Sequence, residues 1–336
     1  MALRPVPWAI GHGAHNAVEG ARLSLHAGTR GARGVMSPTD MRVTALPVPG
    51  GAVRIHKGAA VMPNDYVPGS SQAYAVEEQS STDFPIPPTG SAGGAVRYLV
   101  ARVMDDQYAG QAPTDVINGP YNDYAWLSSD PRVNPPSYPW TLLARINQPA
   151  NTATITQAMT TDLRQVANPQ IKDDWIARPT VNAHLTGWSH ILRQAKNGTG
   201  DDRGEQFPDG PHGGEFAVFC PTWATYVLVE FTWSGIRCSG QNAWGGYYLQ
   251  YTDGTTWRSS QDFGWDQLEA GYPYVTEWTL ADRLYLPPSM RGKTLRFYPR
   301  AFRDVNSPNT GITMTNRSGL NFRARFLEVA DASLSA

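Results

Sequence analysis

Apolar and polar residues alternate along several segments in the second half of the chain. In residues 295–302 and 321–326 apolar side chains alternate with basic ones, which is typical of strands with one buried and one solvated face. Residues 216–219 and 226–233 are rich in aromatic and β-branched side chains and also favour strands. We therefore expect an antiparallel β-sandwich here, with jelly-roll-like connections.

The first half repeats this pattern in shorter segments separated by turn residues. Residues 52–55 and 59–62 flank His56-Lys57-Gly58 and predict a β-hairpin. A closing strand is expected at residues 142–146, whereas residues 118–139 predict an irregular insertion rich in Pro, Asn, Asp and Tyr. The other strands of a β-sandwich or small barrel are expected at residues 41–46, 74–77, 83–86 and 96–104.

One segment has helical periodicity. Within residues 17–26 the apolar side chains recur three or four positions apart, and Asn16 and Glu19 have the spacing of a capping box. A short N-terminal helix is therefore expected. The Gly-rich residues 27–34 that follow lack the spacing of a phosphate-binding loop and predict a turn.

Length and turn content indicate two domains of the all-β class. A chain of 336 residues with 32 Gly and 27 Pro is long enough for two cores and rich in turns. Residues 169–179, PQIKDDWIARP, have the composition of a linker bounded by prolines. We predict two antiparallel β-sandwich or jelly-roll-like domains with a short N-terminal helix. Residues 1–169 form the first domain, 170–180 the linker and 181–336 the second domain.

The balance of charges narrows the classes of partner. With 28 basic and 29 acidic residues, the chain offers no electrostatic reason for a nucleic-acid or anionic-membrane partner. No segment approaches the ~20 apolar residues of a membrane span, and MALRPVPWAI lacks the features of a secretory signal. We expect a soluble protein that is not exported by a cleaved signal. Cys220 and Cys238 form either a disulfide or two free buried thiols, and a reducing cytoplasm favours the thiols.

Motifs for catalysis are missing from the sequence. The chain lacks G-x-S-x-G, H-E-x-x-H and C-x-x-C, so neither an enzyme nor a cofactor nor a metal centre is predicted. A glycoside hydrolase stays an open alternative, because the spacing of its two catalytic carboxylates is set in space rather than along the sequence. One acidic loop is interpreted as solvated rather than calcium-binding; its members are Asp201, Asp202, Glu205, Asp209 and His212.

A dense aromatic segment covers residues 242–275. Trp244, Tyr247, Trp257 and Trp265 are interleaved there with small polar residues, and flat rings beside polar groups suit recognition, including sugar stacking. Aromatic residues at alternate positions of a strand belong inside, so a core or subunit-contact position is the favoured interpretation. In the alternative, glycines form turns that expose the rings, and hydrogen bonds orient a glycan or another partner; the groups that would make them are Asp253, Asn242 and Gln261.

A set of motifs in the first half resembles one protein family. Residues 142–146 precede a turn and then Asp162-Leu163-Arg164, which on its own predicts a local ion pair around an inward-pointing Leu163. The closing L-A-R-I strand, the turn and the T-D-L-R end resemble the N-terminal module of minor tail proteins from tailed bacteriophages of Gram-positive hosts. Ordered matches extend this resemblance over residues 15–169; they lie at 15–17, 34–46, 58–61, 74–76 and 99–110.

The resemblance implies a structural protein of the virion tail. Its N-terminal domain would dock on other tail proteins at the tail tip or baseplate, and its C-terminal domain would face outward. Assembly in the host cytoplasm and a trimeric state are implied by the same analogy, and a composition rich in aromatics and poor in charge also favours a homo-oligomer. Two alternatives stay open: a receptor-binding adhesin for host cell-surface glycan, and a tail-associated polysaccharide hydrolase.

Overall fold

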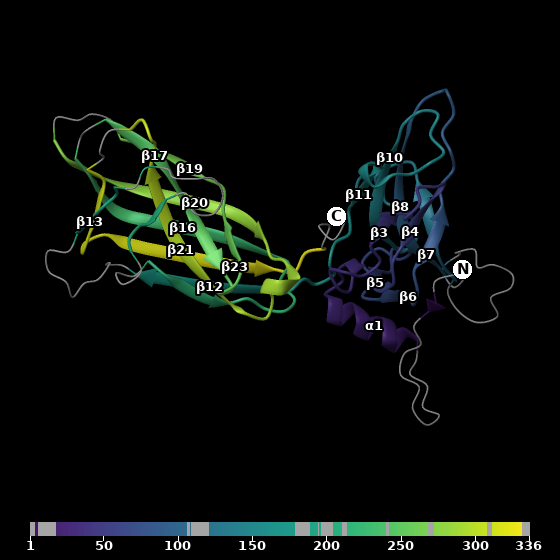
Figure 1. Ribbon diagram of the computed structural model, residues 1–336. Helices are drawn as coiled ribbons and strands as arrows, with labels where there is room; N and C mark the ends of the chain where they lie inside the picture. Colours follow the sequence, from purple (N-terminus) through teal and green to yellow (C-terminus); the bar gives the residue numbers. More distant parts are fainter. Residues whose placement is uncertain are drawn as a thin grey trace. The chain divides into compact units, whose positions relative to one another are not determined.

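The computed structural model divides the chain into two compact units (Figure 1). The first unit contains Met1–Pro169 and Val329–Ala336, and the second contains Gln170–Glu328. The structure describes residues 4–5, 18–105, 108, 121–178, 189–193, 195, 204–209, 214–239, 242–267, 272–307 and 311–330.

Short antiparallel strands surround the main apolar core of the first unit. Its three sheets have the strand orders β1-β6-β5-β2, β11-β10-β8-β9 and β3-β4-β7, and the helix α1 packs against β6 (Figure 1). The elements are β1 (Arg4–Pro5), α1 (Val18–Thr29), β2 (Gly34–Val35), β3 (Val43–Ala45), β4 (Ala52–Ile55), β5 (Gly58–Pro63), β6 (Ala73–Glu78), β7 (Thr82–Pro85), β8 (Ala95–Met104), β9 (Tyr121–Leu127), β10 (Trp140–Gln148), a short 3-10 helix (Gln157–Met159) and β11 (Thr160–Asp162).

A buried ion pair fastens α1 to the core of the first unit. Arg22 Nη2 donates to Asp105 Oδ2 over 2.6 Å, and both side chains are less than a tenth exposed. The Tyr74 hydroxyl donates to the same Asp105 oxygen, and the Arg22 guanidinium lies over the Tyr74 ring. Burial beside this carboxylate raises the pKa of Tyr74. Since loss of either partner would leave a buried charge unpaired, the pair holds the helix in place.

Asp162-Leu163-Arg164 forms the predicted local ion pair. Arg164 Nε and Nη2 donate to the Asp162 carboxylate over 3.0 and 2.7 Å, and the Arg164 side chain is fully buried. Leu163 packs against the small apolar cluster of Val100, Trp140 and Leu142, as the inward orientation predicted. Arg164 Nη1 also donates to the backbone carbonyls of Pro38 and Asp40. The triplet therefore ties the end of β11 to a turn more than a hundred residues earlier.

Two six-stranded antiparallel sheets form a sandwich in the second unit. The first sheet has the order β12-β23-β16-β22-β13, with β20 paired to β16; the second has the order β14-β21-β17-β18, with β15 paired to β21 and β19 to β17. Large aromatic side chains such as Trp233, Phe231 and Phe322 fill the core between them. The elements are β12 (Ile171–Arg178), β13 (Ser189–Ile191), β14 (Glu205–Gln206), β15 (Phe216–Phe219), β16 (Tyr226–Cys238), β17 (Ala243–Thr252), β18 (Trp257–Ser259), β19 (Phe263–Gln267), β20 (Tyr274–Tyr285), a short 3-10 helix (Pro288–Met290), β21 (Thr294–Arg303), β22 (Thr313–Thr315) and β23 (Gly319–Leu327).

The all-β class with one N-terminal helix is confirmed. The four strong strand signals of the second half correspond to β15, β16, β21 and β23. In β21 and β23 the apolar side chains of the alternating pattern are buried, and most of the side chains between them are partly or fully exposed.

Three local predictions are wrong. β4 and β5 are not a hairpin: β4 pairs with β3 and β7, whereas β5 pairs with β2 and β6. A Cβ on Gly58 would lie 2.5 Å from the backbone of Asp40 and Met41, so the chain passes close to another segment there and enters a different sheet. The insertion predicted at residues 118–139 contains the strand β9, which pairs with β8 along its whole length.

The third wrong prediction is the linker at residues 170–180. Eight of these residues form β12, an edge strand that pairs with β23 from Ile171 to Arg178. Its charged residues and flanking prolines gave it the composition of a linker, but charges are common on edge strands, where they discourage pairing with other chains. The contacts divide the units between Pro169 and Gln170, ahead of this strand.

Candidate functional site

The predicted aromatic site is not one surface. Trp244 and Trp257 are 38% and 46% exposed, but they lie near opposite ends of β17. Trp244 is its second residue, and Trp257 is paired with Thr252, its last. Eight residue steps along a strand span about 27 Å, so these two rings do not form a compact site.

The other two predicted rings, Tyr247 and Trp265, belong to the core. They are 7% and 6% exposed, and both stack on Trp278, with ring centroids 5.2 and 5.5 Å away. The Tyr247 hydroxyl donates to the backbone carbonyl of Thr279, and Trp265 Nε1 donates to that of Phe302. Burial raises the pKa of Tyr247. For these two rings the interpretation as core residues is confirmed, and neither presents a face to a ligand.

Gly245 and Gly246, next to Trp244 and Tyr247, do not form an exposing turn. Gly245 and Gly246 lie inside β17. A Cβ on Gly246 would be 2.5 Å from Phe302 Cζ, and one on Gly245 would be 2.7 Å from Trp265 Cζ2. The missing side chains therefore make room for large rings, which is the opposite of the predicted effect.

The three polar residues of the predicted site are scattered as well. Asp253 holds the turn after β17: its Oδ1 accepts from the backbone N–H groups of Thr255 and Thr256, and its Oδ2 accepts from Lys293 Nζ over 2.6 Å. The bond from Lys293, followed by those from the turn, lowers the pKa of Asp253, and the side chain is only 1% exposed, which closes it to a sugar. Asn242 and Gln261 are exposed, but the Gln261 backbone is held by Asp282.

The best candidate surface lies instead on the outer face of the first sheet. Trp175, in the middle of β12, is 76% exposed. Exposure alternates along the whole strand, with residues 171, 173, 175 and 177 on the outside. The sequence IKDDWIAR has no matching alternation, because apolar and charged residues occur on both faces of the strand, so the hydropathy pattern does not mark the outer face.

Lys172 and Arg178, on the other face of β12, hold the strand against the second sheet. Lys172 Nζ donates to the backbone carbonyl of Phe219 over 2.8 Å, and Arg178 Nη2 donates to that of Glu215 over 2.7 Å. The Arg178 guanidinium also lies 4.3 Å from the centroid of the Phe216 ring. These contacts close the edge of the sandwich at both ends of β15 and fix the strand that carries Trp175.

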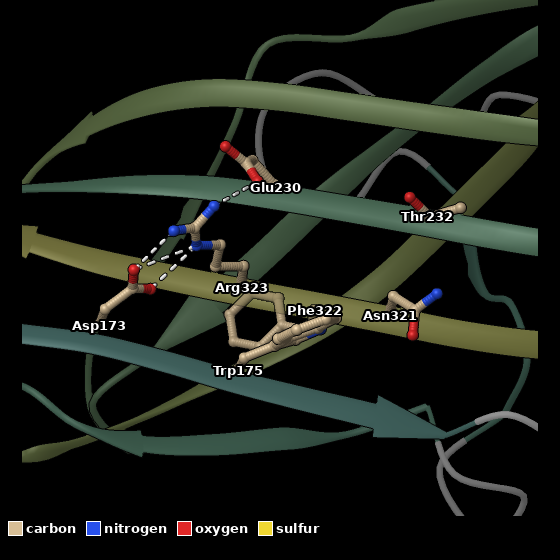
Figure 2. Close-up of a pocket in the computed structure, with 7 residues that line it drawn as sticks. All are labelled: Asp173, Trp175, Glu230, Thr232, Asn321, Phe322 and Arg323. Carbon is tan, nitrogen blue, oxygen red and sulfur yellow. Dashed lines mark hydrogen bonds and ion pairs between the residues drawn. The ribbon is translucent and has the colours of Figure 1, made fainter.

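Register brings polar side chains next to this ring. Trp175 lies opposite Arg323 of β23, which lies opposite Glu230 of β16. One row along, Asn321 lies opposite Thr232. Residues paired in this way share a face of the sheet, and with Asp173 and Phe322 they line a shallow groove of about 470 Å³ (Figure 2).

An ionic ladder crosses the groove. Arg323 Nε and Nη2 donate to Asp173 over 3.0 and 2.6 Å, and Arg325 Nη2 donates to the same carboxylate over 3.1 Å. Arg323 Nη1 reaches Glu230 at 3.4 Å, so the guanidinium lies between two carboxylates (Figure 2). The bonds from Arg323, followed by those from Arg325, lower the pKa of Asp173 to about 2.

The rest of the groove keeps free hydrogen-bonding capacity. The Glu230 side chain is 59% exposed, and among the described residues its only polar contact is the long one with Arg323. Within the described part of the chain, the side chains of Thr232 and Asn321 have no hydrogen-bond partner. The groove therefore offers one aromatic face, one accessible carboxylate, one hydroxyl and one amide.

Other candidates carry no site in the described residues. Among these, no three His, Cys, Asp or Glu side chains gather closely enough to hold a metal ion, and no helix is both long and apolar enough to cross a bilayer. Cys220 and Cys238 are free and buried, and burial raises the pKa of Cys220 to about 11. Asn16, Asp201, Asp202 and His212 lie outside the described residues.

Comparisons with known proteins do not identify a family. No family model and no curated protein matches the sequence. Among solved structures, that of infectious bursal disease virus, Gx strain, is 10% identical with a TM-score of 0.28, covering 92% of this chain and 78% of that one. The VP2 subviral particle of the same virus is 9% identical with a TM-score of 0.24, covering 89% of this chain and 68% of that one. The CBM22-1-CBM22-2 tandem domain of Paenibacillus barcinonensis Xyn10C is 11% identical with a TM-score of 0.22, covering 88% of this chain and 97% of that one. TM-scores this low carry no argument about function.

Proposed function

We propose that this chain is a non-enzymatic structural protein of a phage virion that binds host cell-surface polysaccharide through the Trp175 groove. The observation that carries the proposal is the exposed Trp175 ring on a sheet face whose other groove residues are polar or charged at the surface. A buried aromatic would serve the core, and an isolated surface aromatic would lack partners. This ring lies beside groups that bind hydroxyls.

The chemistry of the groove suits a sugar. An indole face packs against the apolar C–H face of a pyranose, while its hydroxyls need donors and acceptors around the rim. Glu230 accepts, Asn321 does both, and Thr232 adds a hydroxyl. The groove is open and shallow, so a single site would bind weakly, and several copies on one particle would raise the avidity through effective concentration.

The tail location rests on the sequence resemblance over residues 15–169. In this proposal the first unit docks on other tail proteins at the tail tip or baseplate, and the second unit faces the host. Copies assemble into a homo-oligomer, for which a trimer is the expected state. Light scattering would show a mass above the 36.8 kDa of one chain at micromolar concentration; a monomer over the whole range would contradict the oligomer.

The binding proposal is tested with the whole chain and purified host cell-wall polysaccharide. Trp175→Ala should weaken binding by about tenfold or more, which corresponds to about 1.4 kcal/mol of lost stacking. Trp257→Ala is the matched control, since it removes another exposed indole outside the groove and should leave binding unchanged. Equal binding by both variants would contradict the proposal.

A second readout of the same mixture tests the non-enzymatic part of the proposal. Reducing ends are counted after prolonged incubation of the chain with the polysaccharide. No increase over the polysaccharide alone is expected. Accumulation of shortened chains would replace the binding protein by a hydrolase.

A further inference from the structure

We infer that the Trp175 groove selects sugar chains without acidic groups, and that Glu230 is the residue that determines this specificity. The inference rests on the proposed function, because it concerns the ligand of the same groove. It follows from which charges of the groove are already bound and which remain accessible.

The arginine of the groove is not available to an anionic ligand. Arg323 donates two hydrogen bonds to Asp173, in the bidentate arrangement that matches guanidinium to carboxylate. Its third nitrogen is directed at Glu230. A phosphate or uronate would have to displace one of two carboxylates that the protein itself supplies.

Asp173 is likewise hydrogen-bonded within the protein. It accepts from Arg323 and also from Arg325, whose Nε and Nη2 lie 3.2 and 3.1 Å from Oδ2. The second arginine of this face is therefore also held by a carboxylate of the ladder. Asp173 acts as an anchor that orients the arginines and is not an acceptor for a ligand.

Glu230 is the carboxylate that remains accessible. It is more exposed than Asp173, at 59% against 37% for the side chain, and its contact with Arg323 is the longest of the ladder. Glu230 lies two strands from Trp175, about 10 Å across the sheet, so a sugar stacked on the indole would approach it with its hydroxyl edge. A carboxylate accepts hydrogen bonds from hydroxyl, amide or ammonium groups and repels acidic ones.

The neighbouring row adds no compensating cation. Thr232 and Asn321 are neutral, and they lie next to Glu230 and Arg323 on their own strands. With Arg325, whose bonds to Asp173 complete the ladder, the arginines and carboxylates balance at two each, so no excess positive charge attracts an acidic ligand, and Glu230 is the most exposed of these charges. Polymers of sugar phosphate or uronic acid are therefore disfavoured.

The test measures binding of the whole chain to three soluble probes: N-acetylated chitooligosaccharide, its deacetylated form, and poly(glycerol phosphate). The unmodified protein should bind the first two at least tenfold more tightly than the third. Glu230→Gln, which keeps the shape and removes the charge, should weaken binding of the first two by about tenfold and strengthen binding of the third, because charge-assisted hydrogen bonds and repulsion are lost together.

Glu277→Gln is the matched control: it makes the same change at an exposed position of β20 outside the groove, and it should leave all three affinities unchanged. If poly(glycerol phosphate) binds as tightly as the other probes, or if Glu230→Gln leaves the preference unaltered while Trp175→Ala abolishes binding, the inference is wrong and the proposed function stands. If no probe binds although host cell-wall polysaccharide does, only the inference fails; if Trp175→Ala also leaves binding of that polysaccharide unchanged, both fail.

Discussion

Two aromatic regions of the second unit differ in the exposure of their rings, and this difference cannot be read from their sequences. The segment from Trp244 to Trp265 is dense in rings, yet its central rings pack against Trp278 in the core. The strand β12 contains a single ring, Trp175, and exposes most of it. In the dense segment Tyr247 and Trp265 are core residues and Trp244 and Trp257 are partly exposed, whereas the lone ring of the charged edge strand is more exposed than any of these four.

The physical reason is the partner available to each ring. Tyr247 of β17 and Trp265 of β19 face the opposite sheet of the sandwich, where burial of apolar area stabilises the fold. The Trp175 ring lies on the outer face of the first sheet, where its neighbours in register are Arg323 and Glu230. No described element covers that ring, so its apolar area is left for a ligand.

The largest expected effect is loss of a core ring. Trp265→Ala should lower the free energy of unfolding by about 3–5 kcal/mol, because it leaves a cavity beside Trp278 and removes the hydrogen bond from the indole to the Phe302 carbonyl. This free energy is measured by urea unfolding of the whole chain, from the transition of the second unit. A cost below about 1 kcal/mol would mean that this ring is not a core residue.

A smaller effect is expected from the glycine that makes room for these rings. Gly246→Ala should cost about 1–3 kcal/mol by overpacking against Phe302. Gly264 is paired with Gly246 across β17 and β19, and a Cβ there meets nothing within 4 Å, so Gly264→Ala is the matched control and should be close to neutral. Equal costs for the two variants would contradict the close approach of the Phe302 ring.

The exposed rings should contribute little to stability. Trp175→Ala and Trp257→Ala are each expected to change the free energy of unfolding by less than about 1 kcal/mol, as for surface positions generally. Thermal melts of both variants beside Trp265→Ala give the comparison directly. A large loss for Trp175→Ala would place that ring in a packed interface and would weaken the case for an accessible binding face.

The smallest effect concerns pH. An unperturbed Asp has a pKa of about 3.9, and that of Asp173 is lowered to about 2. The ionic ladder therefore stabilises the fold above about pH 4, and its contribution is lost as the pH falls toward 2. Melting temperatures between pH 2 and 6 should show a shallower acid-side slope for Asp173→Asn than for the unmodified chain. Because these side chains are about a third exposed, the difference should be modest.

Much of the fold could be predicted from the sequence, because alternation is a local signal. The strands β15, β16, β21 and β23 were predicted on that basis, and so was the ion pair of Asp162 with Arg164. Strand partners could not be predicted in the same way: β4 and β5 are neighbours in sequence but belong to different sheets, since pairing is decided by distant segments.

The candidate site was harder to predict than the fold. Its residues come from three strands, at sequence separations of more than fifty residues, and meet only through register. Composition pointed to Trp244, Tyr247, Trp257 and Trp265, because a count of rings does not show which face of a strand they occupy. No alternation of polarity marked Trp175, because apolar and charged residues occur on both faces of β12, and its charges and flanking prolines resembled a linker.

The central claim is that Trp175 is the ring that contacts the ligand. The most direct measurement is an NMR titration of the ¹⁵N-labelled chain with host cell-wall oligosaccharide, in which the indole N–H signals of the eleven tryptophans are followed and that of Trp175 is identified with Trp175→Phe. The account predicts that the Trp175 signal shifts most, while those of Trp265 and Trp233 stay in place. Shifts confined to Trp244 or Trp257, or no shift of any indole, would contradict it.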